Sequence, residues 1–402
     1  MERKRATNKL QVLLTYFQAK RRLKWSRGQI NRWHNKRIKK IIQHAKTSSP
    51  FYQTLYGKEE EFENLPILSK KEMMESFKFF NTEGISKEEA IAFAKAGEEE
   101  GTYKSNIRGI TVGLSSGTSG TRGVFLVSEK EASLWCGNIL AKTLTKSIFS
   151  KQRVALFLRA NSNLYETVSW LRYFNLDGVY DGILEYDPEI LVVPPSVLKK
   201  LPAIFPKKVI SVAEVLEPFD QAILERKFQT RIDQIYQCTE GFLGFTCRMG
   251  TLHLNEDVLH IEKEYLDKGS GRFVPVLTDL RRTTQPIIRY RLDDVLIEGT
   301  CCCGFSYQAI QAVEGRLKDV LILKKKGRGS LSIFAREFEA VFSTEYLVKQ
   351  SDEKTLHLYG GCKKRLLNFL EAKGVSIPTI ITHEKLPMRK DYEKLRRIQR
   401  ST

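Results

Sequence analysis

Apolar runs and amphipathic segments alternate through the middle of the chain. Strand-like runs occupy 153–159, 189–194, 207–213 and 231–236, and segments with helical spacing lie between them near 164–174, 196–201 and 218–229. Such alternation is typical of a mainly parallel sheet covered by helices. We therefore predict an α/β unit for this part of the chain.

The first third of the chain is predicted to be largely helical. Its evidence is the capping box, in which a serine oxygen accepts from a free backbone amide and a glutamate three positions later reaches back. Three such pairs occur: Ser69/Glu72, Ser86/Glu89 and Ser128/Glu131. Each marks the start of a helix.

The pattern changes again in the last third. Residues 251–323 form short strand-like runs separated by Gly, Pro and Asp, which predicts a β-rich subdomain. After Gly315 come a strand (319–323), a helix (334–342), two more strands, a helix (363–373) and a basic tail. We therefore divide the chain into a basic helical N-terminal arm (1–50), a core domain (51–316) and a small α+β C-terminal domain (317–402).

Charge is concentrated in the N-terminal arm. The chain of 402 residues carries a formal charge of +19, and residues 1–50 hold fifteen Lys or Arg against the single acid Glu2. With Trp25 and Trp33 nearby, this arm could contact anionic lipid, nucleic acid or an acidic protein. We favour the alternative of a solvated amphipathic helix that caps the fold, because charge runs usually have no specific ligand.

Composition excludes some classes of protein. Apolar residues make up 42% of the sequence, but no stretch approaches the roughly 18 to 20 apolar residues of a membrane span. The start of the chain does not resemble a secretory signal, and the seven cysteines are an odd number. We expect a globular protein in a reduced, cytoplasmic setting.

The sharpest local signal is LSSGTSGTRG at 114–123, between a strand-like run and the helix that begins at Ser128. Glycines allow a tight turn that aims backbone amides at a phosphate, and hydroxyls add donors. The residues concerned are Ser115, Ser116, Gly117, Thr118, Ser119, Gly120 and Thr121. It is not a Walker loop, because Gly-Lys-Ser/Thr is absent. The alternative is a flexible linker.

Three further segments carry candidate chemistry. In IYQCTEG (235–241) a predicted strand ends and leaves Tyr236, Thr239 and Glu240 at its carboxyl edge, where open α/β sheets bind ligands. The segments at 278–295 and 313–322 are dense in Arg and Asp. Either one alone is typical of a surface ion-pair network.

Together, in this order and spacing, the four segments resemble the acyl-adenylate-forming superfamily and specifically its phenylacetate-CoA ligase-like branch. Upstream, SSPFYQTLYG followed by FENLPILSKKEMMESF looks like that branch's N-terminal pattern, so the resemblance spans about residues 40–345. It implies a large N-terminal adenylating domain with parallel-sheet and β-rich subdomains, and a small mobile α+β C-terminal domain.

The resemblance also implies roles for single residues. Residues 115–123 would be the phosphate loop, Thr239 would act on the α-phosphate of ATP and Glu240 on Mg²⁺. Tyr236 would line the adenine side, with Ala213 and Glu214 facing the base. Asp294 would accept from the ribose hydroxyls, Arg316 matches the family's Gly-Arg segment, and Lys318 falls at its hinge.

Two departures from the family pattern concern positive charge. Arg122 and Gly123 stand where the wider superfamily has Pro-Lys, and Arg122 could supply the missing charge. Near the C-terminus the family's catalytic lysine matches Lys394 by its context before LRR and Lys390 by proximity. The alternative for this segment is a solvated basic helix.

Cys247 and His253 lie upstream of a C-x-C-G element formed by Cys301, Cys303 and Gly304. Zinc holds Cys and His ligands tetrahedrally, and several phenylacetate-ligase-like proteins show a similar pattern, so we expect a structural zinc held by these four residues. Cys302 is a neighbour or a rival ligand. The alternative is a group of unpaired buried thiols with a solvent-facing histidine.

We expect a two-step ligase. ATP and a small-molecule carboxylate would give an acyl-adenylate, and a thiol of coenzyme A or of the phosphopantetheine on an acidic acyl carrier protein would then attack. Two alternatives stay open. A related branch adenylylates the hydroxyl of a deazaflavin coenzyme, and a non-catalytic protein could use the fold to bind nucleic acid or membrane through the arm. We expect no nucleic-acid partner.

Tyr165, Trp170 and Phe174 would form an aromatic wall of the acyl pocket or pack in the core.

Overall fold

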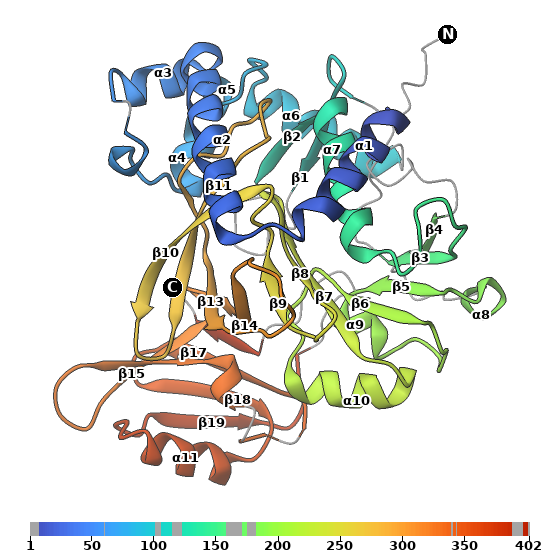
Figure 1. Ribbon diagram of the computed structural model, residues 1–402. Coiled ribbons are helices and arrows are strands. Elements are labelled where there is room, and N and C mark those ends of the chain that lie inside the picture. The colour runs from blue at the N-terminus through green and yellow to red at the C-terminus, as the bar shows by residue number, and fades with distance from the viewer. Residues whose placement is uncertain are drawn as a thin grey trace.

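The computed structural model describes residues 8–59, 61–100, 106–114, 123–157, 171–174, 182–338, 341–342, 344–387 and 397–400, with the side chains of 98–100, 171–174 and 267 left aside. In Figure 1 the helices of the first third lie along the top of the molecule, above the central sheet, and the C-terminal residues form a separate layer below it. No helix among the described residues combines the length and the apolar character needed to cross a bilayer.

The first third is helical, as predicted. Its helices are α1 (Lys9–Arg22), α2 (Arg27–Ser48), α3 (Pro50–Tyr56), η1 (Phe62–Asn64), α4 (Lys70–Glu75), α5 (Phe77–Phe80) and α6 (Lys87–Glu100). The box at Ser69/Glu72 caps α4, and the Ser86 hydroxyl accepts from the Glu89 amide before α6. These side chains satisfy amides that a helix N-terminus leaves free.

The basic N-terminal segment packs into the body of the protein. Helix α1 lies against α7 (Glu129–Thr143), where Gly137 permits the approach because a Cβ there would lie 2.4 Å from the Val12 carbonyl oxygen. Helix α2 is fixed by Arg27, which donates to both carboxylate oxygens of Glu256 at 2.6 and 2.8 Å. The segment therefore packs on the fold as a cap.

A hairpin carries the predicted phosphate loop. Strands β1 (Ile110–Leu114) and β2 (Val124–Ser128) pair antiparallel, with Leu114 opposite Val124. The residues between them, 115–122, lie outside the described part of the chain. Helix α7 follows β2 directly and starts with the predicted Ser128/Glu131 capping box.

The central sheet has twelve strands, and five of them form the predicted parallel unit. Strands β3 (Val154–Phe157), β4 (Leu171–Phe174), β5 (Ile190–Val193), β6 (Lys208–Ser211) and β7 (Ile232–Cys238) run parallel in the order β7-β6-β5-β3-β4. Helices α8 (Ile183–Tyr186), α9 (Pro195–Leu198) and α10 (Pro218–Phe228) connect them. The helix predicted near 164–174 is wrong at its end, because 171–174 pairs with β3 as a strand.

The β-rich part continues the same sheet. Strand β7 pairs parallel with β6 on one side and antiparallel with β8 on the other, so the sheet changes direction at β7. The antiparallel strands are β8 (Gly241–Thr246), β9 (Leu252–Leu254), β10 (Leu259–Asp267), β11 (Arg272–Asp279), β12 (Tyr290–Arg291), β13 (Asp294–Gly299) and β14 (Ala309–Arg316). The ends of β7 and β13 thereby belong to one sheet.

The C-terminal residues form a unit with its own core. It contains β15 (Val320–Lys324), β16 (Ser330–Phe334), η2 (Ala335–Phe338), β17 (Tyr346–Asp352), β18 (Thr355–Gly360), α11 (Lys363–Ala372), β19 (Thr379–His383) and β20 (Ile398–Arg400). Buried residues from 321 to 398 form one apolar cluster. Of the helix predicted at 334–342, Phe334 instead ends β16 and Ala335–Phe338 form the short 3₁₀-helix η2, while residues 339–340 lie outside the described part of the chain.

Candidate functional site

Glu240 lies in the turn where β7 ends and β8 begins. Its Oε2 accepts from the Thr239 hydroxyl at 2.8 Å and its Oε1 from the Tyr290 hydroxyl at 3.1 Å. Burial raises the pKa of Tyr290, and the Glu240 carboxylate raises it further, so the phenol stays a donor. The two hydroxyls fix the orientation of a half-buried carboxylate at the end of the sheet.

Arg282 connects this turn to the stem of the predicted phosphate loop. Its guanidinium donates to the carbonyls of Thr239 and Glu240, both at 3.2 Å, and to the carbonyl of Leu126 on β2 at 3.4 Å. Gln285 adds a second link, because its Oε1 accepts from both Leu126 N and Arg282. The loop's stem and the Thr239–Glu240 turn are therefore held together by one buried cation.

The loop residues themselves lie outside the described part of the chain. They are Ser115, Ser116, Gly117, Thr118, Ser119, Gly120, Thr121 and Arg122. Lys390, Lys394, Tyr165 and Trp170 lie outside it too, as does the side chain of Phe174.

Tyr236, Asp294 and Arg316 come together from three strands. The Tyr236 hydroxyl donates to Asp294 Oδ2 at 2.7 Å, and Arg316 Nε lies 4.0 Å from Asp294 Oδ1. Asp294 is the first residue of β13 and is paired with Arg316, the last residue of β14. Burial raises the pKa of Tyr236 and the Asp294 charge adds to the rise, which keeps the hydroxyl protonated.

The other predicted residues lie at the same end of the parallel strands or at the domain junction. Ala213 follows β6 with a left-handed backbone (φ 69°), two residues beyond Ser211, which pairs with Gln234 of β7. The Glu214 carboxylate accepts from Ser196 N and Oγ, both at 3.0 Å, at the start of α9. Lys318 is half-buried just after β14.

Sequence reasoning missed Tyr290, Arg282 and Gln285. All three lie in the segment at 278–295, from which only Asp294 had been singled out. The high frequency of arginine in this segment indicated a functional region. It could not indicate which arginine side chain points inward, because that depends on the path of the chain from β11 to β13.

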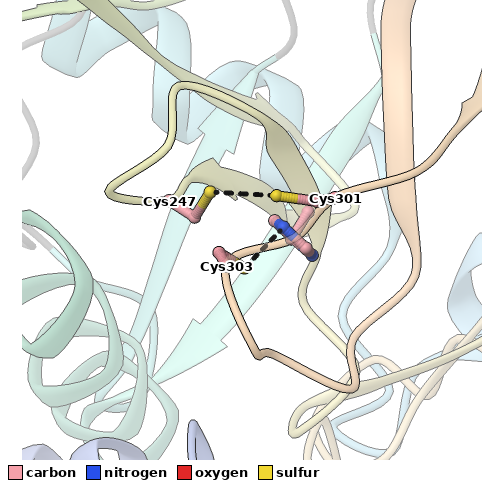
Figure 2. Close-up of side chains that lie close together, drawn as sticks. Cys247, Cys301 and Cys303 are labelled. Carbon is pink, nitrogen blue, oxygen red and sulfur yellow. Dashed lines mark hydrogen bonds between the residues drawn. The ribbon is translucent and has the colours of Figure 1, made fainter.

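Cys247, His253, Cys301 and Cys303 form the second candidate site. One ligand atom from each lies within 4.8 Å of the others. Cys247 Sγ is 3.6 Å from Cys301 Sγ, and Cys303 Sγ is 3.4 Å from His253 Nε2, as Figure 2 shows for the cysteines. Tetrahedral zinc with Zn–S bonds of about 2.3 Å separates sulfurs by about 3.8 Å.

The donor set of this cluster suits zinc. His253 Nδ1 lies 2.9 Å from the Tyr307 carbonyl, to which it can only donate, so Nε2 is left with its lone pair toward Cys303. The amides of Met249 and Phe305 point at Cys247 Sγ and Cys303 Sγ at 3.4 Å, as suits thiolates. Cys302 is exposed and outside the cluster. The geometry thus offers one imidazole and three sulfurs to a single ion.

Comparison with known proteins relates this fold to solved structures. No protein-family model and no curated protein sequence matches the chain. A 2-hydroxyisobutyryl-CoA ligase in the postadenylation state, in complex with 2-HIB-AMP, matches with a TM-score of 0.66 and 16% identity over 94% of this chain and 91% of that one. An acyl acid amido synthetase in complex with 2,4-DB matches with 0.56 and 10% identity over 90% and 85%.

The same ligase in an open conformation, with 2-HIB-AMP and CoA, gives 0.54 at 15% identity over 90% of this chain and 89% of that one. The ligase and the amido synthetase match 94% and 90% of this chain. The protein has the fold of the acyl-adenylate-forming enzymes.

Proposed function

We propose that this protein adenylates a small-molecule carboxylate with ATP and then transfers the acyl group to a thiol. The observation that carries the proposal is the link through Arg282, which joins the stem of the 115–122 loop to the Thr239–Glu240 turn. A phosphate loop and a magnesium-binding carboxylate must meet at one nucleotide for this reaction. The fold, shared with an acyl-CoA ligase and an acyl acid amido synthetase, supports it.

The first step forms a bond between a carboxylate oxygen and the α-phosphorus and breaks the bond to pyrophosphate. Negative charge grows on the α-phosphate and on the leaving group, so the site needs fixed donors rather than a protein nucleophile. Residues 115–122 would supply amides and hydroxyls, and Thr239 a hydroxyl. Magnesium, which prefers hard oxygen ligands, would neutralise phosphate charge when held by Glu240.

Recognition of the nucleoside would use the residues gathered at the ends of β6, β7 and β13. Asp294, whose carboxylate is oriented by Tyr236 and Arg316, would accept from the ribose hydroxyls. Tyr236 would pack beside the adenine, and the backbone at Ala213 and Glu214 would face its edge. The Glu214 side chain has another role, since it caps α9.

In the second step the sulfur of a thiol attacks the acyl carbon and AMP leaves. Coenzyme A is the acceptor we propose, because the neighbouring ligase was solved with CoA. A hinge at Lys318 and a lysine at 394 or 390 would bring the C-terminal unit into each step. The cysteine cluster would hold a structural zinc that ties the β8–β9 turn to the β13–β14 loop, with no part in the chemistry.

Exchange of labelled pyrophosphate into ATP tests the proposal. Exchange should depend on an added carboxylate from a panel of aryl, fatty and amino acids, and Glu240→Gln should lower it by about 10²-fold. Glu264→Gln, which removes a surface partner of Arg291, is the matched control and should leave exchange unchanged. Full exchange in Glu240→Gln, or exchange driven only by a deazaflavin, would overturn the assignment.

A further inference from the structure

Helix α1 is apolar on two opposite sides. Val12, Tyr16 and Ala19 point into the protein and are buried. The large apolar residues Leu10, Leu14 and Phe17 are 65%, 48% and 51% exposed. At 100° per residue, positions 10, 14 and 17 share a face that lies opposite to positions 12, 16 and 19.

Phe149 extends the exposed face. This residue lies between α7 and β3, is 72% exposed, and places its ring 6.1 Å from that of Phe17. Single exposed apolar side chains are ordinary on protein surfaces. A line of three on one helix, continued by an aromatic ring from another segment, is a contiguous patch and indicates an interaction surface. We call Leu10, Leu14, Phe17 and Phe149 the α1 patch.

Exposed basic residues lie on the same segment as the α1 patch. Lys9, Arg21 and Lys24 are exposed, and residues 3–50 contain no acidic residue. The acids that neutralise basic residues of this segment come from elsewhere, as Glu256 does for Arg27. Lysine and arginine beside exposed leucine and phenylalanine are the composition of helices that lie in the surface of an anionic bilayer.

We propose that the α1 patch docks this protein onto a membrane surface containing anionic lipids. Helix α1 would lie parallel to the bilayer, about 21 Å long, with its outer leucines and phenylalanine among the upper acyl chains. Arg21 continues the exposed face one turn after Phe17, and Arg21, Lys9 and Lys24 would reach headgroup phosphates. The patch is formed by one exposed helix face and one ring beside it, with exposed basic residues on the same segment, which suits the surface of an anionic bilayer. The inference does not depend on the proposed function.

Co-sedimentation of the full chain with vesicles tests this proposal. Vesicles of phosphatidylcholine with about 30% phosphatidylglycerol should bind the protein, and pure phosphatidylcholine should bind it at least about tenfold more weakly. The double variant Phe17→Glu/Phe149→Glu should lose at least about tenfold in binding to the anionic vesicles. Phe79→Glu is the matched control, because Phe79 is 58% exposed on α5, away from α1 (Figure 1).

A charge variant separates the electrostatic contribution to vesicle binding from the apolar one. Arg21→Glu should weaken binding to the anionic vesicles several-fold, whereas Lys363→Glu on α11 should not. All variants should keep the melting temperature and the pyrophosphate exchange of the unmodified protein, so that a folding defect is recognised. Absence of vesicle binding at low salt, or equal losses in the Phe79 variant, would overturn the proposal. So would self-association, or binding to an acidic carrier protein, that Phe17→Glu/Phe149→Glu abolishes while vesicle binding persists.

Discussion

The Tyr236 hydroxyl donates to the Asp294 carboxylate at 2.7 Å across the point where the sheet changes from parallel to antiparallel. Tyr236→Phe removes this donor and leaves the carboxylate free to turn. We expect the KM for ATP to rise about tenfold with a smaller change in kcat, because a hydrogen bond to a charged group contributes about 1.5 kcal/mol or more. Steady-state kinetics with varied ATP measures the effect.

The control for this variant is Tyr265→Phe. Tyr265 donates to Glu298 at 2.6 Å on the distant part of the antiparallel sheet. The Tyr265→Phe variant should leave the KM for ATP unchanged. Equal effects of the two variants would mean that Tyr236 acts only through stability.

Zinc should be bound in one equivalent by the purified protein and lost in Cys303→Ser. Loss of a structural zinc removes binding free energy from the folded state, so the melting temperature should fall by about 5 °C or more. Elemental analysis and thermal unfolding measure the two effects. Cys302→Ser and Cys362→Ser alter exposed cysteines outside the cluster and should change neither quantity. Zinc content well below half an equivalent in the unmodified protein would contradict the site.

Four charged residues connect the C-terminal unit to α9 and α10. Lys199 Nζ lies 2.8 Å from Asp220 and 2.9 Å from Glu345, and Arg397 lies 3.5 Å from Asp220. Asp220→Asn removes the carboxylate between Lys199 and Arg397 and leaves Glu345 as their acidic partner. We expect the C-terminal unit to be released more often, so that trypsin cuts the connector around Lys318 several-fold faster.

Limited proteolysis under native conditions measures that rate, and thermal unfolding separates it from global destabilisation. Glu189→Gln is the control, since Glu189 pairs with Lys146 and Lys207 within the large domain. Cleavage that stays slow at the connector in Asp220→Asn would show that these ion pairs do not hold the two parts together.

The buried pair of His34 and His260 should make stability depend on pH. Their Nδ1 atoms are 3.1 Å apart, and His34 Nε2 donates to the Glu256 carbonyl, so His260 must supply the shared proton. Burial and, to a smaller extent, the neighbouring His34 lower the pKa of His260 to about 4. The unfolded chain therefore binds more protons as pH falls from about 6.5 toward 4, and stability is lost over that range.

The loss could reach about 3 kcal/mol, because each pKa unit corresponds to about 1.4 kcal/mol. Urea unfolding at a series of pH values measures it. His260→Gln should flatten the curve between about pH 6.5 and 4. His44→Gln, which removes a half-buried imidazole bonded to the Thr283 carbonyl, should leave the slope in place.

The sequence predicted the local elements that depend on neighbouring residues. Capping boxes at Ser69 and Ser128 fixed two helix starts, because their partners lie three positions away. The apolar runs at 189–194 and 207–213 became adjacent parallel strands, as their alternation with helices requires. The prediction was wrong at 171–174 and at Phe334, where strand pairing with β3 and with β15 overrode helical spacing.

The sequence by itself also selected Tyr236, Asp294 and the four members of the cysteine cluster, because residue type and motif order carry that information. Only the tertiary structure decided which side chains meet. Asp294 reaches Tyr236 across 58 positions of sequence, and Arg282 reaches the stem of the hairpin across 156. Such contacts depend on how β7 joins the two halves of the sheet. The burial that keeps Tyr290 protonated beside Glu240 likewise arises from packing, which no local pattern records.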